Sequence, residues 1–224
     1  MPNPELIQVT LPDGMARAVP SSSKAGQALR EAAGSLSRDV LAVKVNGVLR
    51  DLDSTLTEDA WLEPVTFDSP EGKEVYRHSS THIMAQAVKE VFPSAQLAIG
   101  PAIRDGFYYD FAFERPFTPE DLEQIEARAH EIIKADHAFK RMEMPQQEAV
   151  EFFKARGEKL KEEILRNLED ATVSLYHQGD FVDLCRGPHV PSTGRVKTLK
   201  LLSSAGAYWR GDERNPMLQR IYGT

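Results

Sequence analysis

The chain has 224 residues, of which 41% are hydrophobic and 27% are charged, and its formal net charge at pH 7 is −7. These values are ordinary for a soluble globular protein and exclude a polycation. No run approaches the roughly 20 apolar residues that cross a bilayer, and the N-terminus lacks the pattern of a signal peptide. A single cysteine excludes an internal disulfide framework, so we expect a cytoplasmic protein that does not bind membranes.

The first 67 residues predict a small domain of strands with one helix. Strands are predicted at residues 5–11 and 15–19 around a Pro-Asp-Gly turn, and a helix at 24–33. An Asn-Gly pair then predicts a hairpin between strands at 40–45 and 48–52, before a short strand at 61–65. This order fits a β-grasp, ubiquitin-like domain. It contains no histidine or cysteine, so we expect a folding or docking module.

A second, larger domain is predicted from residue 68, and it contains all six histidines. A helix at 74–91 carries His78 and His82 four residues apart, on one face. On a helical wheel this face lies opposite the main apolar stripe, which argues against packed core histidines. The face is therefore either solvated or lines a cleft.

The rest of this domain predicts alternating strands and helices, so the fold class is α+β. Tyr109 lies in an aromatic strand, and Lys161 follows a break at 156–158 in a charged helix. His130 and His137 have no partner at ligand spacing, and we take them as ordinary helix and loop residues. The predicted elements are strands at 97–103 and 107–113, a helix from Thr118, a strand at 138–144, a broken helix at 148–167, and strands at 173–177, 181–184 and 199–203.

Cys185 and His189 repeat the spacing of His78 and His82 about a hundred residues later. Two such pairs suggest one site built from two distant segments. Histidine and cysteine suit zinc, but Ser79 replaces the glutamate of the H-E-x-x-H motif, which disfavours a metalloprotease. A structural zinc site and histidines that merely line a polar cleft both stay open on the residues alone.

Charge is distributed unevenly along the chain. Residues 1–67 carry six Lys or Arg against nine Asp or Glu, whereas residues 185–224 carry seven against two. A basic C-terminal stretch in an acidic protein is a candidate for contact with a phosphate backbone. The alternative is a solvated surface with a local fluctuation of charge.

Several stretches together resemble the N-terminal region of bacterial threonyl-tRNA synthetases. They are residues 77–82, 98–101, 106–110, 183–191 and 205–212. The resemblance covers essentially the whole chain and implies a TGS module at residues 1–67 and a tRNA editing domain at 68–224. The histidine and cysteine pairs also resemble those of alanyl-tRNA editing proteins. The ligase core and the anticodon-binding domain of the family are absent, and the sequence stops abruptly, so we expect a piece of a longer chain.

The resemblance implies an aminoacyl-tRNA deacylase that proofreads by hydrolysing the ester of mischarged Ser-tRNA(Thr). In this view His78 and Lys161 position and activate the water. Asp183 and Tyr109 contact the amino group and the hydroxyl of the seryl group. The pocket around the terminal adenosine or the ester is then shaped by His82, Cys185 and His189.

The resemblance also bears on cofactors and partners. In the threonyl family it implies editing without a metal, whereas zinc held by His78, His82, Cys185 and His189 is the alternative. ATP and a further zinc belong to the absent ligase core.

The partners implied are the acceptor end of tRNA(Thr), met by residues 185–224, and the serine moiety. The whole protein would be a homodimer that ligates threonine to tRNA. Other readings are a non-catalytic tRNA-binding or docking module and a free-standing editing protein.

Overall fold

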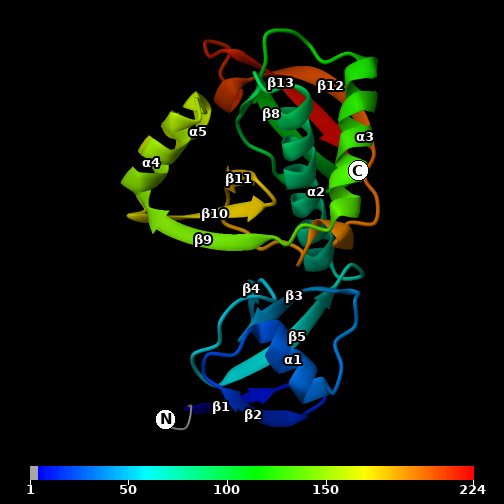
Figure 1. Ribbon diagram of the computed structural model, residues 1–224, viewed down its shortest axis with the longest axis vertical. Coiled ribbons are helices and arrows are strands. Elements are labelled where there is room, and N and C mark those ends of the chain that lie inside the picture. Colours follow the sequence, from blue (N-terminus) through cyan, green and yellow to red (C-terminus); the bar gives the residue numbers. More distant parts are fainter. Residues whose placement is uncertain (1–4) are drawn as a thin grey trace. The chain divides into compact units, whose positions relative to one another are not determined.

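The computed structural model describes residues 5–224 (Figure 1). By contacts the chain forms two compact units. The first contains the chain up to Tyr76 together with Gly187–Pro191, and the second contains Arg77–Arg186 and Ser192–Thr224. The mixture of helices and sheets confirms the α+β class. The functional division predicted at residues 67 and 68 stays a prediction.

The first unit is a five-stranded sheet with one helix, α1, packed on it (Figure 1). The strand order is β2-β1-β5-β3-β4, in which β1 and β5 are parallel and the other neighbours are antiparallel. Asn46 and Gly47 both have positive φ, 51° and 81°, as a two-residue hairpin turn requires. The predicted hairpin is confirmed. The elements are β1 (Leu6–Thr10), β2 (Ala16–Pro20), α1 (Ala25–Ala33), β3 (Val40–Val45), β4 (Val48–Arg50) and β5 (Ala60–Thr66).

The second unit contains two sheets and four helices that carry or support the candidate site. One sheet has the order β11-β10-β9, and the other has the order β12-β13-β8-β6 with β7 paired to β8. The helices are α2 (Pro70–Val91, which enters this unit at Arg77), α3 (Pro119–Ala135), α4 (Gln146–Ala155) and α5 (Lys159–Arg166). The strands are β6 (Gln96–Leu97), β7 (Ala102–Ile103), β8 (Gly106–Ala112), β9 (Lys140–Pro145), β10 (Thr172–Gln178), β11 (Phe181–Leu184), β12 (Leu201–Tyr208) and β13 (Met217–Gly223). None of the described helices combines the length and the apolar content that crossing a membrane requires.

Local sequence signals account for where α3 and α5 begin. Thr118 caps α3 by accepting a hydrogen bond from the backbone N–H of Asp121, whose side chain accepts one from the N–H of Thr118. Such a reciprocal cap satisfies two backbone donors that the first helical turn leaves unpaired. Between α4 and α5, Gly157 has a φ of 72°, which glycine adopts without strain. The predicted break is confirmed, and it places Lys161 in the first turn of α5.

Two predicted strands differ from those observed. The run predicted at 97–103 forms only the two-residue strands β6 and β7, because Gly100 and Pro101 interrupt it. The strand predicted at 199–203 is instead β12, which pairs with β13 as far as Tyr208. Its segment Ala205-Gly206-Ala207 has a low strand propensity, and the partner strand overrides that preference.

Gly100 lets the ring of Tyr109 lie directly against the backbone. A Cβ atom at position 100 would stand 2.1 Å from Cδ2 of that ring. Tyr109 lies on β8, is 1% exposed and stacks on Phe111 with ring centroids 4.8 Å apart. The ring is therefore fixed on two sides.

Gly100→Ala should destabilise the chain by about 1–3 kcal/mol, because the new methyl group overlaps a ring that has no room to move. Urea unfolding measures this cost. In a Tyr109→Ala background the same substitution should cost at least about 1 kcal/mol less, since the clashing ring is gone. Equal costs in the two backgrounds would show that the ring does not confine Gly100.

Candidate active site

His78 and His82 lie one turn apart on α2, with ring centroids 5.4 Å apart and planes at 81°. His78 is half-buried, whereas His82 is only 2% exposed. The His82 ring meets the rings of Phe139 and Phe181 edge-on, with centroids 6.3 and 6.4 Å away. The wheel argument against packed histidines is therefore wrong for His82. Residues 79–88 of α2 are buried on all sides, so this face is not solvated.

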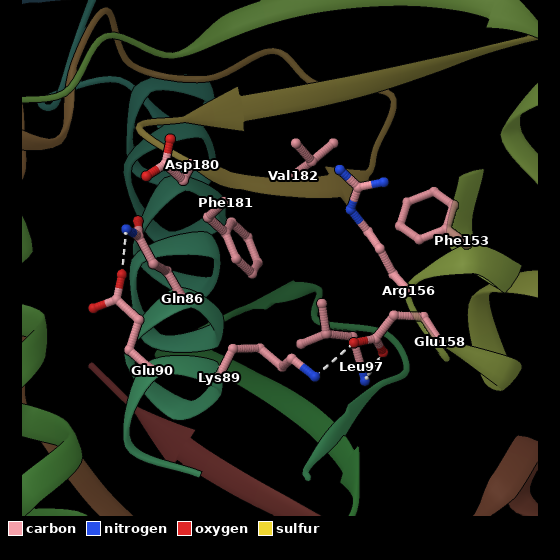
Figure 2. A pocket seen from close by; sticks show the side chains of 10 residues that line it. All are labelled: Gln86, Lys89, Glu90, Leu97, Phe153, Arg156, Glu158, Asp180, Phe181 and Val182. Atoms are coloured by element: carbon pink, nitrogen blue, oxygen red, sulfur yellow. Dashed lines mark hydrogen bonds and ion pairs between the residues drawn. The ribbon is translucent and has the colours of Figure 1, made fainter. Parts of the chain in front are cut away.

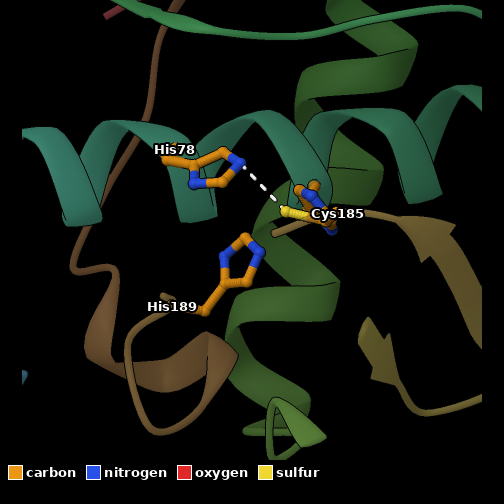
Figure 3. Close-up of side chains that lie close together, drawn as sticks. His78, Cys185 and His189 are labelled. Carbon is orange, nitrogen blue, oxygen red and sulfur yellow. Dashed lines mark hydrogen bonds between the residues drawn. The ribbon is translucent and has the colours of Figure 1, made fainter. Parts of the chain in front are cut away.

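Cys185 is held opposite His78 by the end of β11. Its backbone N–H donates to the carbonyl of Ser174 at 3.1 Å, and the Ser174 hydroxyl donates to the carbonyl of Cys185 at 2.6 Å. The Cys185 Sγ then lies 3.2 Å from Nε2 of His78 (Figure 3). Two segments 107 residues apart in the sequence thus meet at a thiol and an imidazole.

The donor atoms of the predicted quartet lie together. One atom each of His78, His82, Cys185 and His189 all lie within 4.8 Å of one another, and Figure 3 labels three of these side chains. Three imidazoles and one thiol are a donor set that zinc accepts in tetrahedral sites. The residues therefore fit a zinc ion.

Asp183 joins two further predicted residues in a buried chain of polar contacts. Its Oδ1 lies 2.6 Å from Nζ of Lys161, and its Oδ2 accepts a hydrogen bond from the Tyr109 hydroxyl, also at 2.6 Å. Its Oδ1 also accepts from the backbone N–H of Leu184 at 2.8 Å. The Lys161 and Asp183 side chains are 3% and 2% exposed. A buried carboxylate is tolerated when a cation and hydrogen bonds compensate its charge.

The protonation of this cluster follows from burial and from Asp183. Burial, and then the neighbouring carboxylate, raise the pKa of the Tyr109 hydroxyl well above its ordinary value, so Tyr109 stays a hydrogen-bond donor at neutral pH. Burial lowers the pKa of His82 to about 3 against the opposing effect of Asp183, and the charges of His78 and Lys161 act in the same direction as burial. His82 is therefore a neutral imidazole at physiological pH.

Sequence reasoning missed an ion pair that ties α2 to α5. Nζ of Lys89 lies 2.7 Å from Oε1 of Glu158, and Oε2 of Glu158 accepts from the backbone N–H of Leu97 at 2.8 Å. Glu158 occupies the N-cap position of α5 and is 4% exposed, so the helix of the histidines and the helix of Lys161 are joined directly. The available signal was the position of Lys89 on the histidine face of the wheel.

The Lys89–Glu158 pair lines a pocket of about 330 Å³ (Figure 2). Gln86, one turn beyond His82, lies at its edge and donates from Nε2 to Glu90 at 2.9 Å. Phe181, which also contacts His82, forms part of the wall. One wall of this pocket therefore also packs against the buried ring of His82.

The low pKa of His82 predicts a loss of stability in acid. In the unfolded state His82 has its ordinary pKa of 6.5 and binds a proton below that pH. In the folded state the same imidazole binds a proton only at about pH 3. The contribution of the neutral His82 to the free energy of unfolding is therefore fully present above pH 6.5 and is lost as the pH drops toward 3. His82→Gln should reduce the loss of unfolding free energy between pH 7 and pH 5 by about 2 kcal/mol.

Urea unfolding of both proteins at the two pH values, with a chelator present, measures this difference. The difference between the proteins removes the contribution of carboxylates, because they are common to both. Parallel pH profiles would show that His82 is not kept neutral by burial.

Comparisons with known proteins agree with this architecture. Residues 173–222 match the family described as threonyl and alanyl tRNA synthetase second additional domain. Over 98% of its length the chain is 56% identical to a threonine–tRNA ligase of Desulforamulus reducens, of which it covers 35%. It is 52% identical to threonine–tRNA ligases of Pelobacter propionicus and Aromatoleum aromaticum, over 97% and 100% of the chain and 34% of each relative.

The chain thus spans about a third of the length of the curated relatives it matches. The matched domain includes β10, β11, β12 and β13, and with them Asp183, Cys185 and His189. The resemblance predicted from the quoted motifs is confirmed: almost the whole chain is similar to part of the threonine–tRNA ligases, and residues 173–222 match the second additional domain of threonyl and alanyl tRNA synthetases.

Proposed function

We propose that the chain hydrolyses the ester of mischarged Ser-tRNA(Thr), as the editing part of a threonine–tRNA ligase. The observation that carries the proposal is the buried contact of Asp183 with Lys161 and Tyr109, two residues from the thiol that faces His78. A structural zinc site alone would not require a buried lysine and carboxylate beside it. The similarity to threonine–tRNA ligases supports an aminoacyl-tRNA ester as the substrate.

Editing is needed because serine is threonine without one methyl group. A binding pocket rejects a substrate that lacks one methylene by only about 1–3 kcal/mol, or roughly 10–200-fold. A second site that admits only the smaller substrate corrects the remaining errors. The ring of Tyr109, confined by Gly100 and Phe111, would form a rigid wall against the methyl group of threonine.

In the proposed reaction a water attacks the ester carbonyl carbon, and the ester C–O bond breaks to release serine and the ribose hydroxyl. His78 accepts the proton of the water and returns it to the leaving ribose oxygen, as a general base and then a general acid. Lys161, held by Asp183, positions the water and offers its positive charge to the developing oxyanion.

The remaining residues would hold the substrate. Asp183 accepts three hydrogen bonds or ion-pair contacts within the chain, and a carboxylate has about four acceptor sites. One site on Oδ2 is left for the amino group of the seryl moiety, while the Tyr109 oxygen can accept from the seryl hydroxyl. The pocket of the terminal adenosine would be shaped by His82, Cys185 and His189.

We favour editing without a metal. The quartet His78, His82, Cys185 and His189 would hold a zinc ion if one binds, and that ion would supply an activated water. Without a metal, the Cys185 thiol and the His78 imidazole, which are in contact, would hold the water through hydrogen bonds alone.

The remaining expectations are part of this proposal. Residues 1–67 would be a TGS module, supported by the strand order β2-β1-β5-β3-β4 with one helix, and residues 68–224 the editing domain. The whole protein would be a cytoplasmic homodimer that ligates threonine to tRNA with ATP. A non-catalytic tRNA-binding module and a free-standing editing protein are the competing functions.

The purified chain should hydrolyse Ser-tRNA(Thr) at least about 100-fold faster than Thr-tRNA(Thr), as measured by release of labelled amino acid. His78→Ala and Lys161→Met should each lower the rate about 100-fold or more, while circular dichroism checks that both variants fold. Equal rates for the two esters, or no rate above buffer, would reject the editing function. Full activity in a folded variant would reject the role of that residue.

Chelation should leave the hydrolysis rate unchanged within about twofold, because side chains alone hold the water in the proposed mechanism. The measurement combines metal analysis of the purified chain with Ser-tRNA(Thr) hydrolysis before and after dialysis against a chelator. Stoichiometric zinc whose removal abolishes hydrolysis, and whose return restores it, would assign the quartet to a catalytic metal.

A further inference from the structure

The pocket of about 330 Å³ in Figure 2 is separate from the cluster around Asp183 and the quartet, and all of its lining residues belong to the second unit. We call it the β11 pocket, because Asp180, Phe181 and Val182 follow one another along its wall at the start of β11. Its apolar surface comes from the last two of these residues together with Leu97 and Phe153. The pocket is large enough for a small organic molecule.

The open edge of β11 faces this pocket. β11 is the outer strand in the order β11-β10-β9. Only two residues separate Gln178 from Phe181, its partner on β11, so these two form the hydrogen-bonded pair of a two-residue hairpin. The next pair, His177 with Val182, is then not hydrogen-bonded. The backbone N–H and C=O of Val182 therefore point away from β10, toward the open edge.

Two charged side chains at the rim of the β11 pocket have no ionic partner within residues 5–224. The exposed guanidinium of Arg156 lies 3.5 Å from the centre of the Phe152 ring, and one of its N–H groups donates to the Phe152 carbonyl at 3.4 Å. Asp180 is exposed in the turn before β11. Figure 2 shows Asp180 and Arg156 on opposite sides of Phe181. The pocket thus has a negative end and a positive end.

The other charges of the lining are compensated within the chain. Lys89 pairs with Glu158, and Glu90 pairs with Arg128. Nε2 of Gln86 donates to Glu90 at 2.9 Å, which identifies the other amide atom as the acceptor oxygen. This buried oxygen accepts no hydrogen bond from the described part of the chain, which is unfavourable. A ligand N–H group toward which the amide turns would supply the missing bond.

We propose that the β11 pocket binds a short peptide with free ends, of the size of a dipeptide, extended along β11. Such a ligand carries an ammonium group, a peptide group and a carboxylate in a row, and the pocket presents partners in the same order. Asp180 and the Gln86 oxygen receive the ammonium group, and the outward N–H of Val182 donates to the peptide carbonyl. The Arg156 guanidinium binds the carboxylate, while the apolar walls enclose the side chains.

Titration of the ¹⁵N-labelled chain with L-alanyl-L-leucine tests the proposal. The backbone amide resonance of Val182 should shift and saturate with a Kd on the order of 0.1–1 mM, as expected for a ligand of this size. N-acetylation and C-amidation of the dipeptide should each weaken binding about fivefold, and free leucine should bind about tenfold more weakly. A titration that does not saturate by about 10 mM, or equal affinity for free leucine, would overturn the proposal.

Variants of the two rim residues connect each end of the ligand to one side chain. Arg156→Gln and Asp180→Asn should each weaken binding about fivefold. C-amidation should then have no further effect in the first variant, and N-acetylation none in the second, because the partner of that end is already gone. Capping that costs as much in the variant as in the wild type would overturn the assignment of that end.

Arg166→Gln is the matched control. Arg166 is an exposed arginine of α5 that pairs with Glu162, and its loss should leave the Kd within about twofold. Binding of the dipeptide requires no hydrolysis and is therefore independent of the proposed function. Charge-dependent binding by a chain that hydrolyses no ester would support the β11 pocket, whereas a chain that edits but does not bind the dipeptide would overturn it.

Discussion

The structure of the candidate site depends on the compensation of one buried charge, that of Asp183. Its carboxylate lies at the end of β11 and meets Lys161 from α5 and Tyr109 from β8. A buried carboxylate left without partners costs several kcal/mol, so each of these elements must keep its place for the fold to be stable. The same contacts orient a cation and a phenol toward one point. Stability and positioning therefore have a common cause.

A second buried pair extends this arrangement to the histidine helix. Glu158 precedes Lys161 by one helical turn and binds Lys89 of α2. Lys161 and Glu158 on α5 thus take part in one buried ion pair each, while the rings of Phe139 and Phe181 pack against His82. A preorganised site of this kind does not need to rearrange as charge develops in a reaction. Rigidity would also suit the proposed discrimination of two substrates by one methyl group.

Charge along the sequence proved a poor guide to charge in space. The basic excess of residues 185–224 is largely balanced by carboxylates from elsewhere, such as Asp110 beside Arg220, Glu126 beside Lys200 and Glu163 beside Arg210. The predicted contact of the whole stretch with an acceptor stem is weakened by these pairs. Arg186, next to Cys185, is also paired with a carboxylate, that of Asp170 at 3.1 Å, although 84% of its side chain is exposed.

The sequence by itself determined the α+β class, the Asn46–Gly47 hairpin, the cap at Thr118 and the break before Lys161, because backbone preferences within a few residues govern such features. Motifs also brought His78, Cys185 and the family resemblance to notice. Only the tertiary structure decided that His82 is buried and that Lys89 meets Glu158. Those contacts join residues dozens of positions apart, so they depend on how strands and helices pack and leave no periodic trace in the sequence.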